Sequence, residues 1–160
     1  MQQLQQGAML QNGKYRIEKA LGQGGFGITY LATQTVLGNK VAIKELFMQG
    51  VNDRQDSSVT VSNNANSNLF AHQKRKFVKE AQRIAGLDNK HIVKVHDMFE
   101  ENDTAYYVMD YIEGESLQDV ITHHHGALAE SSVRDYLNQI LSALSAMHQH
   151  QYSVNSNVIV

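Results

Sequence analysis

The fold is decided by a short stretch that runs from the glycine-rich loop Gly22-Gln23-Gly24-Gly25-Phe26-Gly27 to Val41-Ala42-Ile43-Lys44. Before the loop, Tyr15–Leu21 alternates apolar and polar residues, which is typical of a half-buried strand. After the loop, Ile28–Thr33 is rich in β-branched and aromatic residues and predicts a returning strand. Leu37–Lys40 then has the composition of a turn. The sequence therefore predicts antiparallel strands on either side of the glycine-rich loop.

A Gly-x-Gly-x-x-Gly loop alone is a weak signal, because two kinds of phosphate site use it. In a dinucleotide-binding fold it leads from a strand into a helix whose N-terminus holds the pyrophosphate. In the other setting it joins two antiparallel strands and covers the phosphates of a nucleotide. Ile28-Thr29-Tyr30 is poor material for a helix start, and a third strand, Val41–Leu46, follows soon after. A crossover helix has no room here, so a dinucleotide-binding oxidoreductase is the least favoured alternative.

Two segments of opposite character follow the third strand. Met48–Asn68 is polar and rich in asparagine, so it is expected to be a loop in which Val59-Thr60-Val61 forms a short local strand. Phe70–Ala85 places apolar residues at helical spacing and predicts a helix, with Gly86 as its stop.

The remaining sequence predicts two more strands and two more helices. His91–Phe99 and Ala105–Tyr111 are expected to be strands, and Ser116–His123 a short helix. A long amphipathic helix is expected over 130–150. Its apolar stripe consists of Val133, Tyr136, Leu137, Ile140, Leu141, Leu144 and Met147. The order of elements predicts an α+β fold, in which a five-stranded antiparallel sheet packs against one helix and two further helices follow.

Composition limits the function classes. The chain has 160 residues, 42% of them hydrophobic, with a net charge of -2 and no cysteine. This is enough for one compact domain, and the near-balanced charge argues against a nucleic-acid partner. The absence of cysteine fits a reducing cytoplasm. The glutamine-rich segment Met1–Gly13 lacks the apolar run of a signal peptide and is expected to be a disordered lead, and no apolar run is long enough to span a membrane.

Four motifs in order resemble those of a bacterial Hanks-type serine/threonine protein kinase. They are Leu21–Tyr30, Val41–Lys44, Phe77–Ala81 and Val108–Gly114. The resemblance covers nearly the whole chain and implies the fold of a kinase N-lobe and hinge followed by the start of a C-lobe. The implied boundaries are a lead at 1–13, the N-lobe and hinge at 14–112 with a polar insertion at 48–69, and partial C-lobe helices at 113–160.

The resemblance also implies an ATP site. Lys44 is expected to pair with the α- and β-phosphates and with Glu80 on the following helix; the alternative partner for Glu80 is Lys76 on the same helix. Met109, Asp110 and Ile112 resemble the gatekeeper and hinge, with the adenine bonded to the backbone of the last two. The other residues implied to contact ATP are Leu21, Gly22, Gly24, Gly27, Thr29 and Ala42, and Thr29 departs from the valine usual in the family.

The catalytic half of such an enzyme is not found in the sequence. In the family, His-Arg-Asp would fall on Val154-Asn155-Ser156, or just past Val160 if Gln151–Asn157 is an insertion. The complete kinase would use ATP and Mg²⁺ to phosphorylate protein hydroxyls, but these residues alone are expected to be inactive because the magnesium ligands and catalytic aspartate are missing. The alternative is a pseudokinase-like module that binds nucleotide or docks without catalysis. The apolar stripe over 130–150 is expected to be exposed and to favour self-association.

Two further features have mundane explanations. Lys74-Arg75-Lys76 begins a basic run that is more often a solvated helix face than a docking surface. His123-His124-His125 has the residue type of a metal site but no acidic or cysteine cluster beside it, so a polar turn is the favoured interpretation.

Overall fold

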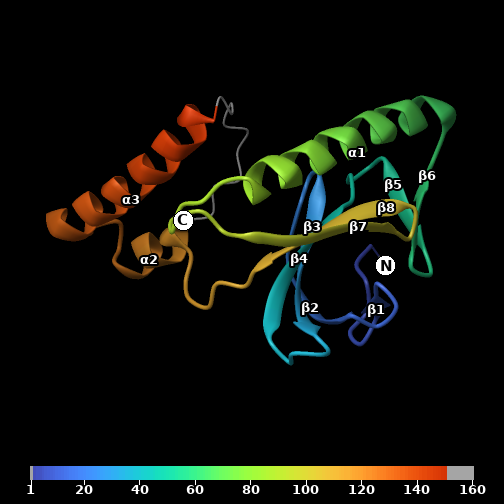
Figure 1. Cartoon of the computed structure of the whole chain (residues 1–160), viewed down its shortest axis with the longest axis horizontal. Coiled ribbons are helices and arrows are strands. Elements are labelled where there is room, and N and C mark those ends of the chain that lie inside the picture. The colour runs from blue at the N-terminus through green and yellow to red at the C-terminus, as the bar shows by residue number, and fades with distance from the viewer. Residues whose placement is uncertain (1, 151–160) are drawn as a thin grey trace. The chain divides into compact units, whose positions relative to one another are not determined.

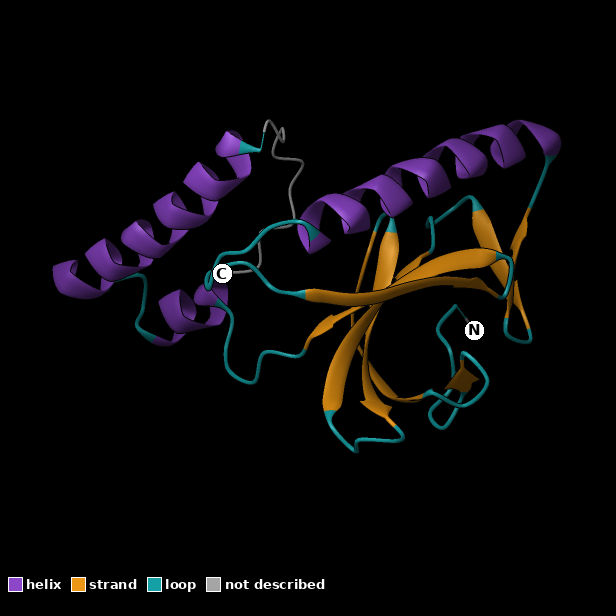
Figure 2. Cartoon of the chain, in the orientation of Figure 1, coloured by secondary structure: helices purple, strands orange, loops and turns teal. Residues whose placement is uncertain are grey.

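The computed structural model describes residues 2–150 and is mixed α and β, as predicted (Figures 1 and 2). The elements in order are β1 (Met9–Leu10), β2 (Tyr15–Gly24), β3 (Gly27–Gln34), β4 (Lys40–Leu46), β5 (Asn52–Gln55), β6 (Ser58–Val61), α1 (Asn64–Ala85), β7 (Val95–Glu101), β8 (Thr104–Asp110), α2 (Leu117–His123) and α3 (Glu130–Gln149). The chain forms two compact units. The first unit is Met1–Gln82 with Val95–Tyr111, and the second is Arg83–Lys94 with Ile112–Val160.

The first unit is built on a six-stranded sheet in the order β1-β2-β3-β4-β8-β7, with every neighbouring pair antiparallel. The predicted meander is confirmed, and Ile28–Thr33 lies in β3, so the dinucleotide alternative is wrong. The predicted five strands gain a sixth, the two-residue β1 at one edge. The expected strand over His91–Phe99 starts later, at Val95, because Asn89 forms a turn by accepting the backbone N–H of His91 through its side chain.

Strand register divides the side chains between the two faces of the sheet. Residues directly opposite each other on paired strands project to the same face, and neighbours along a strand project to opposite faces. Thr29 and Tyr107 are both opposite Lys44, so these three share one face. Tyr106 is opposite Glu45 and shares the other face with it. We call these the Lys44 face and the Glu45 face.

Helix α1 covers the Lys44 face (Figure 1). Phe77, on α1, packs its ring 4.9 Å from that of Tyr107, and both side chains are buried. The helix begins at Asn64, six residues before the expected Phe70, and ends at Ala85 as predicted. Asn63 caps it, since its side-chain oxygen accepts the backbone N–H of Asn66 at 2.9 Å.

The glutamine-rich lead, expected to be disordered, is packed onto the first unit. Leu4 and Leu10 are buried in the core. The backbone of Ile17 in β2 accepts the N–H of Gly7 at 2.8 Å and donates to Ala8 at 2.9 Å. The expectation of disorder is wrong here because two well-placed leucines and a short edge pairing hold a segment of otherwise polar composition.

The polar insertion is also ordered, although it was expected to be a loop. Strands β5 and β6 form a hairpin, which confirms the short strand at Val59–Val61, and α1 begins soon after it. Asn52 is buried, and its side chain accepts the N–H of Met48 at 2.8 Å. Val59 donates its N–H to the carbonyl of Asn102 at 2.8 Å, which joins the hairpin to the turn between β7 and β8.

The second unit contains α2 and α3, near their predicted bounds. Ser116 caps α2 by accepting the N–H of Asp119 at 3.1 Å, and the hydrogen bond from the Ser116 hydroxyl lowers the pKa of the Asp119 carboxyl. Asn89 donates to the Ser142 carbonyl on α3 at 3.3 Å. Val133 and Leu141, both on the apolar stripe of α3, are exposed. Among the described helices, none is both long and apolar enough to cross a membrane.

Candidate functional site

An ion pair on the Lys44 face is the centre of the candidate site. Lys44 Nζ lies 3.5 Å from Glu80 Oε1, and the two side chains are 17% and 32% exposed. Tyr107 joins them: its hydroxyl donates to Glu80 Oε1 at 3.4 Å, and its ring centre is 5.6 Å from Lys44 Nζ. Burial, and after it the negative charge of Glu80, raises the pKa of Tyr107 above its ordinary value. Tyr107 therefore stays protonated and remains a donor to the glutamate.

Sheet and helix together position this pair. Lys44 lies within β4, flanked by Thr29 on β3 and Tyr107 on β8 in direct register. Phe77 and Glu80 are three residues apart on α1, so they lie on neighbouring positions of the same helix side. Packing of the Phe77 ring on Tyr107 therefore brings Glu80 to the lysine. The structure thus places Glu80 beside Lys44, the first of the two partners considered.

The glycine-rich loop closes the hairpin between β2 and β3, with Gly24 and Gly27 in direct register. At Gly27 an added Cβ would lie 2.8 Å from the backbone carbonyl oxygen of Glu45, closer than real Cβ atoms approach. At Gly22 and Gly24 an added Cβ would meet nothing within 4 Å. Gly27 is therefore required because β3 and β4 approach closely there, whereas Gly22 and Gly24 leave one side of the loop open.

The remaining predicted residues lie on β4 and β8, beside the glycine-rich loop, and in the second unit. Ala42 and Met109 are in register on β4 and β8, and both are buried. Leu21 is exposed beside the glycine-rich loop. Asp110 ends β8, and its carboxylate lies 2.6 Å from Nε2 of His96. Ile112 belongs to the second unit, where its side chain is exposed.

Sequence reasoning missed Tyr107 and a second, buried ion pair on the opposite face. Glu45 Oε2 lies 2.6 Å from Arg54 Nη2, and the side chains are 0% and 2% exposed. Glu45 carried a usable signal, since a charged residue at a core-facing position of an apolar strand requires a buried partner. Arg54 carried none, because it lies in a segment whose composition is that of a loop.

The part of the chain that the structure describes contains no cluster of three or more metal-ligating side chains. Residues 2–150 contain no group of three or more His, Asp or Glu side chains placed to hold a metal ion, and the turn at His123–His125 is included in that range. Val154, Asn155 and Ser156, the positions aligned with His-Arg-Asp, lie outside the described residues, as does the segment Gln151–Asn157.

Comparison with known proteins identifies a family. Residues 15–154 match the family model of the protein kinase domain. Over 140 residues the chain is 36% identical to the serine/threonine-protein kinase PrkC of Bacillus subtilis (strain 168), a match that covers 88% of this chain and 19% of the relative. It is 30% identical over 141 residues to the serine/threonine-protein kinase pkn2 of Myxococcus xanthus, covering 88% of this chain and 15% of that protein. The chain thus spans less than a fifth of the length of these relatives.

Solved structures share the fold. The apo form of PpkA-294 superposes with a TM-score of 0.88 at 27% identity, covering 95% of this chain and 54% of that one. The PknI kinase domain of Mycobacterium tuberculosis superposes with a TM-score of 0.71 at 23% identity, over 98% of this chain and 56% of that one. The second likeness supports the fold alone. A kinase family model that matches nearly the whole chain, together with the Lys44–Glu80 pair, shows that this chain belongs to the protein kinase family, with bacterial serine/threonine kinases among its relatives.

Proposed function

We propose that the first unit binds ATP on the Lys44 face, with the glycine-rich loop over the phosphates. The observation that carries this proposal is the ion pair between Lys44 and Glu80, which links β4 to α1 beneath the loop. A lysine held by a carboxylate keeps its ammonium group in one place, so it can neutralise phosphate charge without first being ordered. Phosphoryl transfer depends mainly on this kind of positioning and charge neutralisation.

The other residues have separate roles in this proposal. The Lys44 ammonium group contacts the α- and β-phosphates, while Glu80 and the Tyr107 hydroxyl fix its direction. The open side of Gly22 and Gly24 lets backbone N–H groups approach the phosphates closely. Leu21, Ala42 and Met109 supply apolar contacts to the adenine, and Thr29 lies beside Lys44. The backbone of Asp110 bonds the adenine edge, and the matching role of Ile112 stays a prediction.

The reaction proposed for the complete protein is transfer of the ATP γ-phosphoryl group to hydroxyls of a protein substrate. When bound, Mg²⁺ would neutralise charge on the phosphates. The 160 residues contain neither His-Arg-Asp nor Asp-Phe-Gly. We therefore expect these residues alone to bind ATP without transferring its phosphoryl group.

Thermal unfolding with and without ATP tests the binding proposal. At ATP concentrations 100-fold above Kd, bound nucleotide should stabilise the fold by about 2.7 kcal/mol and raise Tm. Lys44→Met should abolish this shift. Lys76→Met is the matched control. Lys76 is an exposed lysine on α1 and was the alternative partner considered for Glu80. Absence of any shift at millimolar ATP, or an equal loss in both variants, would contradict the proposal.

The second candidate is a module that binds nucleotide but performs no chemistry in any context. It rests on the same Lys44–Glu80 pair, because holding the phosphates of a nucleotide needs this pair whether or not transfer follows. A transfer assay with γ-labelled ATP and a generic protein substrate separates the two, provided it is done on the chain alone and on the chain extended by any downstream coding sequence. Transfer only by the extended chain supports a kinase, and transfer by neither supports the non-catalytic module.

A further inference from the structure

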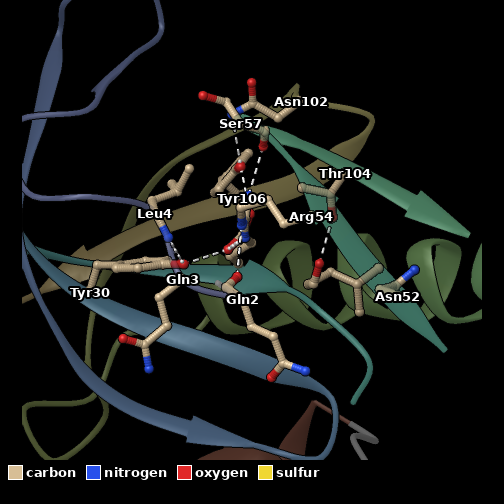
Figure 3. A network of polar contacts seen from close by, with 12 residues as sticks. Gln2, Gln3, Leu4, Tyr30, Asn52, Arg54, Ser57, Asn102, Thr104 and Tyr106 are labelled. Carbon is tan, nitrogen blue, oxygen red and sulfur yellow. Dashed lines mark hydrogen bonds and ion pairs between the residues drawn. The ribbon is translucent and has the colours of Figure 1, made fainter. Parts of the chain in front are cut away.

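A buried polar network lies on the Glu45 face, on the other side of the sheet from the ATP site proposed above (Figure 3). Its centre is the Arg54–Glu45 pair at 2.6 Å. Tyr30 and Tyr106 donate their hydroxyls to the two carboxylate oxygens of Glu45, each at 2.7 Å. Burial, followed by the charge of Glu45, raises the pKa of both tyrosines, so both remain protonated donors. The carboxylate is therefore bound by three groups from three different strands.

The other nitrogen donors of Arg54 bind backbone carbonyl groups. Its Nη1 donates to the carbonyl of Ser57, which closes the β5–β6 hairpin, at 2.7 Å. Its Nε donates to the carbonyl of Gln2, also at 2.7 Å. The guanidinium also lies over the ring of Phe47, 5.3 Å from the centre. A lysine could not make these three directed bonds together, because only the guanidinium presents its donors as a rigid fork.

The lead is held at a second point of the same network. Leu4 donates its backbone N–H to the hydroxyl of Tyr30 at 3.1 Å, and its side chain is buried. Gln2 and Leu4 are thus both fixed to groups that bind Glu45. Burying these polar groups costs free energy unless all are paired, so the lead is required to complete the network.

From this anchor the lead reaches the glycine-rich loop. Gln23, within the loop, donates to the side chain of Gln2 at 2.7 Å and accepts from the side chain of Gln3 at 3.3 Å. Each of these exposed bonds is weak alone. Because Gln2 and Leu4 are fixed by buried groups, the two glutamines meet Gln23 without a large loss of chain entropy.

We propose that Arg54, held by Glu45, is a positioning residue that fixes the lead segment Gln2–Leu4 against the glycine-rich loop. The consequence for ATP rests on the proposed function: a glycine-rich loop that the lead already holds loses less conformational entropy when it closes over the phosphates. The polar insertion that contains Arg54 therefore acts on the nucleotide site through the lead, although it lies on the opposite face of the sheet.

Hydrogen exchange of the nucleotide-free protein tests the positioning directly. The main variant is Glu45→Gln with Arg54→Met, which removes both buried charges while keeping an amide for the tyrosine hydroxyls and an apolar side chain in the space of the guanidinium. Replacing a whole buried pair is often neutral for stability, so Tm should stay near that of the wild type. Amides of the lead and of the glycine-rich loop should nevertheless exchange about tenfold faster, because the hydrogen bonds that Arg54 donates are lost. Amides of β8 should be unchanged.

A second variant keeps the test decisive should the double variant lose its folded state. Gln23→Ala leaves the buried pair intact and should raise exchange only at the glycine-rich loop and at Gln2–Gln3. Gln149→Ala is the matched control, because it removes an exposed glutamine from the end of α3 in the second unit. Unchanged exchange at the loop in Gln23→Ala, or in a folded double variant, overturns the proposal.

A nucleotide titration separates this inference from the proposed function. In the double variant, the Kd for a fluorescent ATP analogue should rise about three- to tenfold. The loop is then less ordered before the nucleotide binds, and a rise of this size corresponds to about 0.5–1.5 kcal/mol of binding free energy, the contribution of one hydrogen bond. If the wild type binds and the variant binds equally, the positioning inference fails and the proposed function stands. If the wild type does not bind, the proposed function fails, and the exchange result alone decides whether Arg54 positions the loop.

Discussion

Gly27 differs from its register partner Gly24 in a way that one substitution can expose. The backbone carbonyl oxygen of Glu45 lies 2.8 Å from the position that a Cβ at Gly27 would occupy, whereas the same position at Gly24 is open to at least 4 Å. The obstacle is backbone rather than a flexible side chain, and it belongs to β4, next to Lys44. Gly27→Ala therefore has to push β3 away from the strand that carries the lysine.

The expected cost follows from the size of the overlap. Overpacking of this kind costs about 1–3 kcal/mol, and the reduced freedom of the unfolded chain returns about 0.4–1 kcal/mol. Gly27→Ala should thus destabilise the nucleotide-free protein by roughly 1–2 kcal/mol, with Tm falling by about 4–8 °C for each kcal/mol in a unit of this size. Gly24→Ala should be neutral or slightly stabilising.

Thermal unfolding of both variants without nucleotide checks the stability difference. A second measurement, the ATP-induced rise in Tm, distinguishes the roles: Gly24→Ala should reduce it because a methyl group intrudes on the phosphates, with no loss of basal stability. Equal basal Tm values for Gly24→Ala and Gly27→Ala would refute the reasoning, because it depends wholly on the neighbour of one Cβ position.

Three more outcomes follow from the structure. Tyr107→Phe should lower stability by about 0.5–1.5 kcal/mol in chemical denaturation, and should weaken ATP binding less than Glu80→Gln does, since it removes only one neighbouring donor. Although burial opposes the shift, hydrogen bonds from Lys14 and Tyr15 lower the pKa of Asp97; the stability they confer is present above the unfolded pKa near 4 and is lost as pH falls through the folded value, so the Tm difference between wild type and Asp97→Asn should shrink below about pH 4. Leu141→Lys, on the exposed stripe of α3, should reduce self-association measured by light scattering, and a wild type that is already a monodisperse monomer would contradict the expectation.

The sheet and the central ion pair could be predicted from sequence because local pattern and motif spacing agree there. Strand periodicity around the glycine-rich loop, the turn at Leu37–Lys40 and the β-branched residues of Val41–Leu46 all indicate the same meander, and the structure has it. Glu80 was found by its motif, and its helical spacing from the buried Phe77 explains why it reaches Lys44. Local propensity and tertiary packing point the same way in this region, which makes sequence reasoning effective.

The wrong predictions share one physical cause. They rested on the composition of a segment, whereas specific hydrogen bonds and ion pairs decide whether it is ordered. Met1–Gly13 and Met48–Asn68 are polar and were expected to have too little to bury. A leucine at position 4 and an arginine at position 54 hold them in place, because each is matched to a specific group on the sheet. Asn63 was likewise expected to belong to a loop, yet it caps α1, which begins at the next residue. Composition alone does not reveal which polar groups of a segment have fixed partners on the sheet.

The two ion pairs of β4 explain why the insertion is ordered at all. Lys44 and Glu45 are adjacent and project to opposite faces, and their partners, Glu80 and Arg54, lie on α1 and on the hairpin that precedes it. Consecutive segments of the chain are thus fixed to consecutive residues of one strand. Removing Arg54 alone would leave the buried carboxyl group of Glu45 without its ionic partner, at a cost of about 3–5 kcal/mol. Because Glu45 on β4 and Arg54 in the insertion depend on each other, the insertion is fixed to the sheet. It leads directly into α1, so it helps to set the position of that helix and the distance from Glu80 to Lys44.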